Sequence, residues 1–451
     1  MKKLFLAVML CIAYISNAQT LSYNDLGVLF SKENINGTAR YNAMSGAFGA
    51  LGGDISAIET NPAGAAVFLM SEFAASLKLT NLKTGATYYG NSQLSENDLT
   101  DLSQAGGVFV FKGYSNNSGW GKVALGFNYS MANDFENPWY AGGDSGYAPI
   151  TDFYDSDPVV YINSDGQEFE NLTSGRNNKY TFTFASQYND NLFFGASISS
   201  YDTEYYQRVL IDEYNNDGNG NYLDISQIQK LFTYGDGISF NLGIISKPND
   251  NVRLGLAYQS PVWYALSEDF VEYDVTIYDN DIDVSSDYPF EDTYSGINAF
   301  DYNLRTPGKL TGSIAYVFEK QGLISVDYIY KNYANIKLSK GEFSGENQSF
   351  KSDLKSTGEL RIGTEWRFDN FSLRGGYHLE KSPYKNAIGS DDFDGYSFGA
   401  GFKFRGGKVD FSYQNSAYTA PYRLYPEYNQ VDAVELDFDN SKFTATLVLN
   451  I

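Results

Sequence analysis

The chain offers few side chains for covalent catalysis. Its 451 residues include one histidine and one cysteine. Acyl transfer by a catalytic triad needs a general base beside the nucleophile, and His378 is the single histidine that could serve. Its place in an alternating polar and apolar segment favours a structural role. We therefore expect a protein that is not an enzyme and that uses no cofactor.

One segment has the spacing of a calcium-binding loop. Acidic and amide residues fall at the ligand positions of an EF-hand-like loop, with glycine at the turn. They are Glu213, Asn215, Asp217, Gly218, Asn219, Asn221 and Asp224. The first position is usually Asp and the last usually Glu, so both ends depart from the pattern. Acidic loops give such matches by chance, and we keep calcium only as an alternative to a plain polar turn, with no metal site predicted.

Charged residues near the C-terminal end alternate with apolar residues. Glu359, Arg361, Glu365 and Arg367 occupy one face of a segment whose other face is apolar. After Asp369-Asn370 the same alternation restarts. Period-two alternation joined by a two-residue turn predicts a β-hairpin.

Segments of this kind recur along the whole chain. Most are about ten residues long, enough to cross a bilayer when tilted. We find fourteen, an even number as in single-chain bacterial barrels: Glu72–Leu82, Ala105–Lys112, Gly121–Met131, Lys179–Tyr188, Asn191–Tyr201, Gly237–Lys247, Asn251–Gln259, Lys309–Phe318, Leu323–Tyr330, Thr357–Phe368, Phe371–Glu380, Gly395–Phe404, Lys408–Tyr418 and Ser441–Ile451.

The connections between these segments alternate between short and long. Short turns occur at 189–190, 248–250, 319–322, 369–370 and 405–407, and long polar connections at 132–178, 202–236, 260–308, 331–356 and 419–440. Outer-membrane barrels have short periplasmic turns and long extracellular loops, whereas a β-sandwich has no such strict alternation. The fold class predicted is all-β, a fourteen-stranded antiparallel transmembrane β-barrel.

A barrel in lipid fixes which face each strand turns to the membrane. An Arg on the lipid face at mid-bilayer would cost roughly 2–4 kcal/mol, so the charged faces should line the lumen. The expected lumen-lining residues are Arg253, Glu359, Arg361, Glu365, Arg367, Arg374 and Asp410. We interpret this set as charge compensation rather than as a selectivity element.

The N-terminus has the composition of a secretory signal peptide. Lys2 and Lys3 precede an apolar run from Leu4 to Ile15, and Ser16-Asn17-Ala18 supplies small residues for cleavage. Cys11 lies inside that run, so the mature chain should hold no cysteine. A formal net charge of −23 argues against nucleic acid as a partner.

Between the signal and the first strand lies a segment rich in small residues, which does not alternate. It runs from Asn36 to Gly64, with Asp54-Ile55-Ser56-Ala57 followed by Asn61-Pro62-Ala63-Gly64. Its glycines fit neither a dinucleotide fingerprint nor a phosphate loop. The segment resembles the N-terminal hatch of the FadL family of outer-membrane transporters, which carries an Asn-Pro-Ala motif. Looser agreement occurs at Tyr258-Gln259-Ser260-Pro261, Leu304–Leu310 and Tyr396–Gly401.

Together with the signal peptide predicted at 1–18, the resemblance implies a hatch at 19–71 that plugs the lumen and a barrel at 72–451. It implies passive uptake of hydrophobic small molecules such as long-chain fatty acids, with lateral exit at a kinked strand and Asn61, Pro62, Ala63 and Gly64 gating release. A plain structural turn is the alternative for that motif. The implied partners of a monomer are the apolar ligand, outer-membrane lipid and the barrel assembly machinery of a Gram-negative bacterium. The alternative function is a FadL-like barrel that serves protein secretion or surface assembly.

Overall fold

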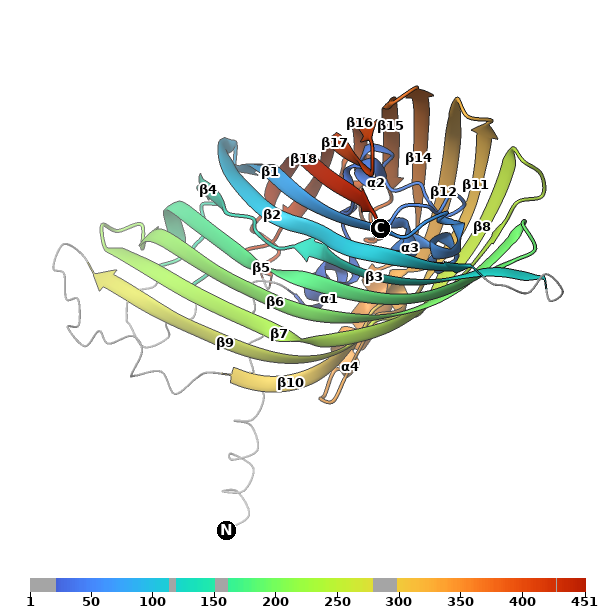
Figure 1. Cartoon of the computed structure of the whole chain (residues 1–451). Helices are drawn as coiled ribbons and strands as arrows, with labels where there is room; N and C mark the ends of the chain where they lie inside the picture. The colour runs from blue at the N-terminus through green and yellow to red at the C-terminus, as the bar shows by residue number, and fades with distance from the viewer. Residues whose placement is uncertain (1–21, 113–118, 151–160, 279–297, 427) are drawn as a thin grey trace, which may run out of the picture.

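The computed structural model describes residues 22–112, 119–150, 161–278, 298–426 and 428–451. The predicted signal peptide lies outside the described residues. One antiparallel sheet dominates, and its first strand, β1 (Glu72–Tyr88), pairs with its last, β18 (Val434–Asn450), which closes the sheet into a barrel (Figure 1). Closure gives both sheet edges hydrogen-bonding partners, as a hydrocarbon environment demands.

The other strands follow one another around the barrel. They are β2 (Asn91–Lys112), β3 (Trp120–Asp134), β4 (Trp139–Gly143), β5 (Asn163–Tyr188), β6 (Leu192–Asn216), β7 (Tyr222–Ser246), β8 (Val252–Gln259), β9 (Trp263–Tyr278), β10 (Asn298–Arg305), β11 (Lys309–Phe318), β12 (Gly322–Asn332), β13 (Lys337–Ser339), β14 (Ser356–Phe368), β15 (Phe371–Glu380), β16 (Phe393–Phe404) and β17 (Gly407–Tyr422).

Several of these segments are parts of one barrel strand. β8 and β9 both pair with β7, while β11 pairs with β8 and β10 with β9, so each couple is one interrupted strand. β4 and β13 are short additions beside β5 and β10. Counted in this way, the described residues form fourteen barrel strands, and the predicted fold class is confirmed.

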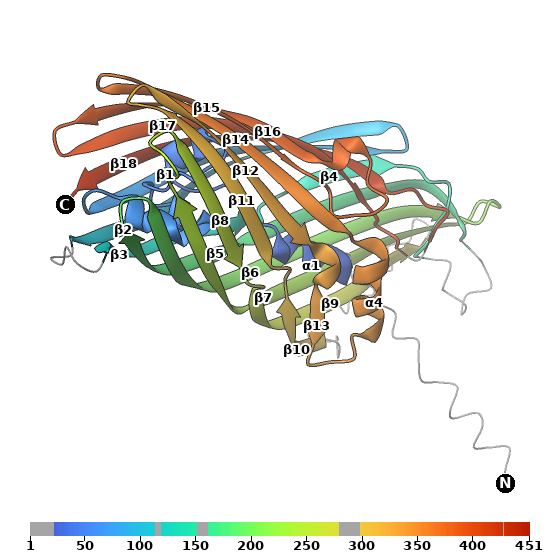
Figure 2. The ribbon, with the colours of Figure 1, turned by 90° about the vertical axis from the view of Figure 1, so that its right-hand side faces the viewer.

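The two interruptions coincide with prolines. Ser260-Pro261-Val262 separates β8 from β9, and Thr306-Pro307-Gly308 separates β10 from β11. Proline has no N–H to donate to a ladder. The Thr306 N–H donates to the Val262 carbonyl at 3.0 Å, and the Val262 N–H donates to Thr306 Oγ1 at 2.9 Å, so the two breaks lie side by side. Figure 2 shows β10, β13 and α4 (Ser344–Asp353) together at one end of the barrel beyond these breaks.

Strands on the long-loop side extend much further than the sequence prediction placed them. The expected loop at 202–236 is mostly strand, since β6 continues to Asn216 and β7 begins at Tyr222. Likewise β1 and β2 continue to a turn at Tyr89-Gly90. The extension is stabilised by an inward row of side chains on β6, among them Tyr205, Val209 and Ile211, which are buried. The predicted extents of these loops were therefore wrong.

The N-terminal segment folds inside the barrel as short helical turns. These are α1 (Tyr23–Ser31), α2 (Ala39–Ala43), α3 (Ala57–Thr60) and the 3-10 helix η1 (Pro62–Val67). We call residues 22–71 the hatch. Its helix α2 contacts β15 to β18, and η1 contacts β3, β5, β6 and β7. Two further 3-10 turns, η3 (Tyr333–Asn335) and η4 (Gly389–Asp391), lie in the connections. No helix within the described residues has the length and apolar character needed to cross a membrane.

Candidate functional site

The Asn-Pro-Ala motif of the hatch is fully enclosed and bridges three parts of the chain. Asn61 is 1% exposed. Its side-chain amide donates to the Gly49 carbonyl at 2.7 Å and to the Ile244 carbonyl of β7 at 3.1 Å. Its Oδ1 accepts from the Ala63 N–H at 3.1 Å, which caps η1, and Pro62 occupies the first position of that helix. Asn61 thus ties the hatch to the barrel wall as well as forming a local turn.

Glycines in the barrel wall make room for this contact. Gly195 of β6 and Gly243 of β7 are register partners. A methyl group on Gly195 would overlap the Pro62 carbonyl group, and one on Gly243 would overlap Asn61 Oδ1. On β8, a methyl group on Gly255 would overlap the Gly49 carbonyl. Glycine inside a strand marks the close approach of another backbone, and these three residues form what we call the glycine seat of the hatch.

On the opposite wall the hatch is held by a charged network. Arg40 Nε donates to Glu365 Oε2 at 2.7 Å, and Arg374 Nε donates to the same oxygen at 2.7 Å. Arg374 also donates to Asp410 at 2.7 Å. Arg367 binds Glu365 Oε1 at 2.6 Å, although its side chain is 50% exposed. Glu365 therefore accepts from three guanidinium groups, one of which belongs to the hatch.

The other expected lumen residues also face inward. Arg361 pairs with Glu359 and donates to the hydroxyl of Tyr41 in the hatch at 3.2 Å. Arg253 donates to the Leu51 carbonyl at 2.9 Å. On the outer face of β14 and β15, Ile362, Trp366, Phe368, Leu373 and Tyr377 are exposed, as the alternation predicts. Several of the inner charged side chains thus contact the hatch.

His378 has none of the geometry of a catalytic base. It lies buried beside the ring of Phe393, with ring centroids 5.1 Å apart. Among the described residues neither of its ring nitrogens has a hydrogen-bond partner. A triad requires a nucleophile on one nitrogen and an orienting carboxylate on the other.

The spaced residues of the calcium pattern do not converge on one site. Glu213 and Asn215 lie on β6 and are buried, whereas Asp217 and Asn219 occupy the exposed turn that follows. The Asp217 carboxylate accepts from the N–H groups of Asn219 and Asn221, and these bonds lower its pKa to about 2. Asp224 follows on β7. Across the described parts of the chain, no group of three or more His, Cys, Asp or Glu side chains could hold a metal ion. In the structure the segment is a β-hairpin formed by β6 and β7.

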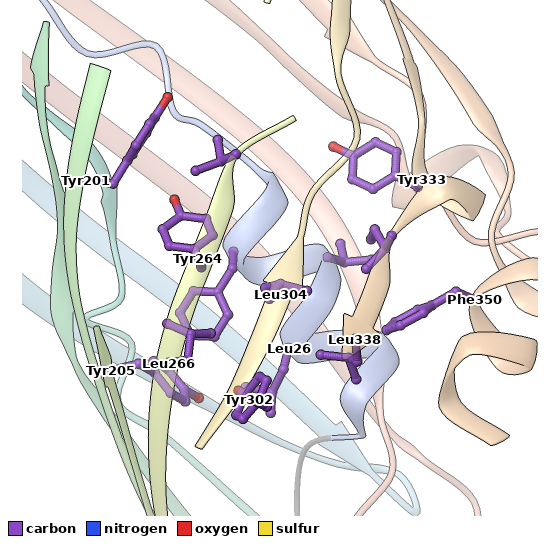
Figure 3. Close-up of a cluster of buried hydrophobic side chains, with 14 of the residues drawn as sticks. Leu26, Tyr201, Tyr205, Tyr264, Leu266, Tyr302, Leu304, Tyr333, Leu338 and Phe350 are labelled. Atoms are coloured by element: carbon purple, nitrogen blue, oxygen red, sulfur yellow. The ribbon is translucent and has the colours of Figure 1, made fainter. Parts of the chain in front are cut away.

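Inside the barrel, α1 packs within a cluster of buried aromatic and aliphatic side chains from the strands, and we call the space that these strand side chains enclose the chamber. Leu26, Val28 and Phe30 of α1 are buried. Figure 3 shows this helix between Tyr201, Tyr205 and Tyr264 on one side and Leu338 and Phe350 on the other. The ring of Phe30 packs edge-on against Phe135 at 5.7 Å and against Tyr205 at 6.2 Å. The chamber includes residues of β9 and β10 just beyond the proline breaks, among them Tyr302 and Leu304.

A single carboxylate follows α1 and is held by four donors. Glu33 Oε2 contacts Lys309 Nζ at 2.8 Å and Lys179 Nζ at 3.3 Å. Its Oε1 accepts from the Tyr201 hydroxyl and the Gln259 amide, both at 3.3 Å. Burial favours the neutral form of Glu33, but the two ammonium groups outweigh it and hold the pKa of this carboxyl well below its ordinary value.

Beside the chamber, β2 and β3 separate. Their pairing ends at Gln104 and Ser130, and the register of β3 against β5 shifts between Met131 and Asn133. Here β3 pairs with the hatch instead: the Asn34 N–H donates to the Ala132 carbonyl at 2.8 Å, and the Asn36 amide donates to the Met131 carbonyl at 2.9 Å. Such a bulge bends a strand and ends its pairing. The pairing of β3 is thus interrupted beside the chamber.

A closed barrel with an internal hatch and an apolar chamber defines the class of plugged outer-membrane channels. The family model described as "Outer membrane protein transport protein (OMPP1/FadL/TodX)" matches residues 26–420, and the chain belongs to this family. Its members are transport proteins, so the chain is a transport protein of the outer membrane and not an enzyme. This confirms the family resemblance inferred from the hatch motifs.

Solved structures with the same fold have low sequence identity to the chain. A FadL homologue from Pseudomonas aeruginosa aligns over 93% of this chain and 99% of its own, at a TM-score of 0.61 and 14% identity. The CymD monoaromatic hydrocarbon channel aligns over the same shares, at 0.53 and 15%. The toluene transporter TodX of P. putida also does so, at 0.52 and 12%. Among curated proteins no relative matches.

Sequence reasoning missed three parts of this site. It did not single out Arg40, Glu33 or the glycine seat. The seat had a visible signal, since glycine inside an alternating strand marks a close approach of backbone. The partners of Arg40 and Glu33 had none, because residues 325 and 276 positions apart meet only when the barrel closes.

Proposed function

We propose that this chain takes up long-chain fatty acids or similar apolar molecules that carry an anionic head group. The observation that carries the proposal is the composition of residues 23–33. An apolar helix with buried Leu26, Val28 and Phe30 is followed by Glu33, whose carboxylate lies between Lys179 and Lys309. In chemical terms this segment is an apolar body ending in a carboxylate, and it occupies a chamber suited to a ligand of that kind.

The negative charge of the head group distinguishes fatty acids from aromatic hydrocarbons as candidate ligands. The solved relatives are described as channels for toluene and monoaromatic hydrocarbons. A neutral hydrocarbon would replace the contacts of α1, but when Glu33 withdraws it would leave Lys309 without its counter-charge and Lys179 with Glu59 alone, at 3.4 Å. An uncompensated buried charge is strongly unfavourable. A fatty-acid carboxylate supplies that charge, so the lysine pair favours an anionic amphiphile.

The exit we propose is the separation between β2 and β3. Ala132, at the register shift of β3, and Phe135, directly after its end, belong to the same apolar cluster as α1. A ligand displacing α1 would reach the bilayer there without crossing water. Release requires the hatch contacts with β3 to break, and Asn61 and Pro62 would govern that step through their contact with the glycine seat.

Several accompanying expectations belong to the same proposal. The chain would be exported through a cleaved signal peptide at residues 1–18, folded by the barrel assembly machinery and active as a monomer. Residues 19–71 would act as the hatch and 72–451 as the channel.

The test is uptake of a labelled long-chain fatty acid by whole cells expressing Asn61→Ala or Pro62→Ala. Both changes loosen the turn that seats the hatch, and the barrel should persist because its closed ladder does not depend on the hatch. Uptake should fall while the amount of barrel at the surface stays constant. Normal uptake in both variants would contradict the proposed gating role.

A second candidate function is service as a surface component for secreted proteins. The observation that favours it is the length of β5, β6 and β7, which have 25 or 26 residues each and extend an ordered sheet past the membrane-crossing length. Deletion of the gene separates the two candidates. Loss of secreted proteins from the cell surface, with fatty-acid uptake intact, would favour this second function.

A further inference from the structure

An apolar groove lies on the outer wall of the barrel. The groove has a volume of about 770 Å³ and crosses β3, β5, β6, β7, β8 and β11. Its walls include Phe184, Phe194, Leu242 and Leu256, which are exposed on the outer face of the barrel. The volume is within the range of small-molecule sites. On a barrel, this face is in contact with lipid hydrocarbon.

The floor of the groove is the reverse side of the glycine seat. Gly195 and Gly243 contribute to the groove from outside, while their inner faces contact Pro62 and Asn61 of the hatch. Since neither glycine has a side chain, the wall between the groove and the hatch is one backbone thick at this point. Ala196, next in sequence and facing outward, adds only a methyl group to the floor.

The groove begins near the short turns of the barrel. Trp120, the first residue of β3, lies at one end of it and packs edge-on against Tyr188, which precedes the short turn at 189–190, with ring centroids 5.2 Å apart. Aromatic girdles of this kind mark the level of the lipid head groups. Short turns are periplasmic in this class, so the groove runs from the periplasmic interface into the hydrocarbon layer.

We propose that the groove binds one acyl chain of a phospholipid from the periplasmic leaflet. The occupant must be apolar and elongated, must arrive from the membrane, and must have its head group at the Trp120 level. An acyl chain gains little hydrophobic energy on leaving other lipid chains, because these are as apolar as leucine. Binding therefore depends on close packing in the groove. A substitution that fills the groove should therefore weaken binding of the acyl chain.

The site places a lipid and the hatch on opposite sides of the same two glycines. Occupancy would support the wall against which Asn61 and Pro62 rest. This inference does not depend on which compound the channel carries, and its failure would leave the proposed uptake function untouched.

The test is photo-cross-linking in nanodiscs with a phospholipid that carries a diazirine on its acyl chain. For the unaltered full-length mature chain, cross-linked peptides should be concentrated in β6 and β7 around residues 194–196 and 242–244. Cross-links spread evenly around the barrel would overturn the proposal, and this arm requires no substitution.

A second arm fills the groove. Ala196→Trp, or the smaller Ala196→Leu, should reduce cross-linking at β7 at least about tenfold, equivalent to a loss of roughly 1.4 kcal/mol in affinity. Ala400→Trp is the matched control, because Ala400 faces outward on β16 away from the groove. Undiminished cross-linking at β7 in folded Ala196→Leu would overturn the proposal, as would an equal loss in the Ala400→Trp control.

Discussion

Replacing Glu33 by Gln should raise the affinity of the channel for fatty acids. The substitution keeps the size of the side chain but removes the carboxylate shared by Lys309 at 2.8 Å and Lys179 at 3.3 Å. Removal of one partner from a buried ion pair costs roughly 3–5 kcal/mol. Lys179 retains Glu59 at 3.4 Å, and the Glu33 side chain is 22% exposed, so we expect a cost at or below the lower end of that range.

A ligand carboxylate can recover part of this cost. If about half of it is recovered, the affinity for a long-chain fatty acid rises by roughly 1.4 kcal/mol, or about tenfold. The assay is binding of a fluorescent fatty acid to purified protein, with the fatty alcohol of equal length as the ligand control. Glu342→Gln, on an exposed residue, is the control variant.

The comparison between acid and alcohol decides whether charge is responsible. The alcohol has no carboxylate, so its affinity should change much less than that of the acid. An equal gain for both ligands would show that the substitution merely loosens α1. No gain for the acid would refute the argument that Glu33 occupies the place of a ligand head group.

Three further outcomes follow from the contacts of the hatch. Gly243→Ala would push a methyl group into Asn61 Oδ1, at a cost of roughly 1–3 kcal/mol for overpacking. Hydrogen exchange of the η1 amides should therefore become faster. Gly312→Ala is the control, because a methyl group there meets open space and should leave the exchange of η1 unchanged. Glu365→Gln removes the negative charge shared by Arg40 and two wall arginines and replaces one acceptor oxygen by an amide donor. Proteolysis within residues 36–64 should therefore become faster while the barrel resists heat as before; unchanged proteolysis would mean that the network does not hold the hatch. The pKa of Glu33 is depressed in the folded protein, so the stability that its carboxylate contributes is fully present above the ordinary pKa of 4.5 and is lost only as the pH falls through the lower pKa of the folded state. Hydrogen exchange of α1, corrected for intrinsic rates, should therefore be equal at pH 7 and pH 5.5. Faster exchange at pH 5.5 would contradict this account.

The barrel could be predicted because each strand carries its own signal. Side chains alternate between lipid and lumen with a period of two, so Ile362 and Arg361 reveal opposite faces without any knowledge of the neighbouring strands. The asymmetry of the connections then gives closure and orientation. Strand lengths were harder to predict. β6 keeps its alternation past the membrane, at Tyr205 and Val209, but its outer face there is polar and was interpreted as loop.

The seat and partners of the hatch required the closed structure. The pairing of Arg40 with Glu365 joins the hatch to a strand near the other end of the chain. Nothing in local sequence selects that carboxylate over Glu359, which pairs with Arg361 instead. The family resemblance located the Asn-Pro-Ala motif, yet it did not indicate that Gly243 must be glycine to admit Asn61.

The most direct test of the central claim is an experimental structure of the protein with a long-chain fatty acid bound. The account predicts that the carboxylate of the ligand lies between Lys179 and Lys309, that its chain occupies the space of Leu26, Val28 and Phe30, and that α1 has left the chamber. A fatty acid bound elsewhere in the barrel, with α1 and Glu33 still in place, would contradict it.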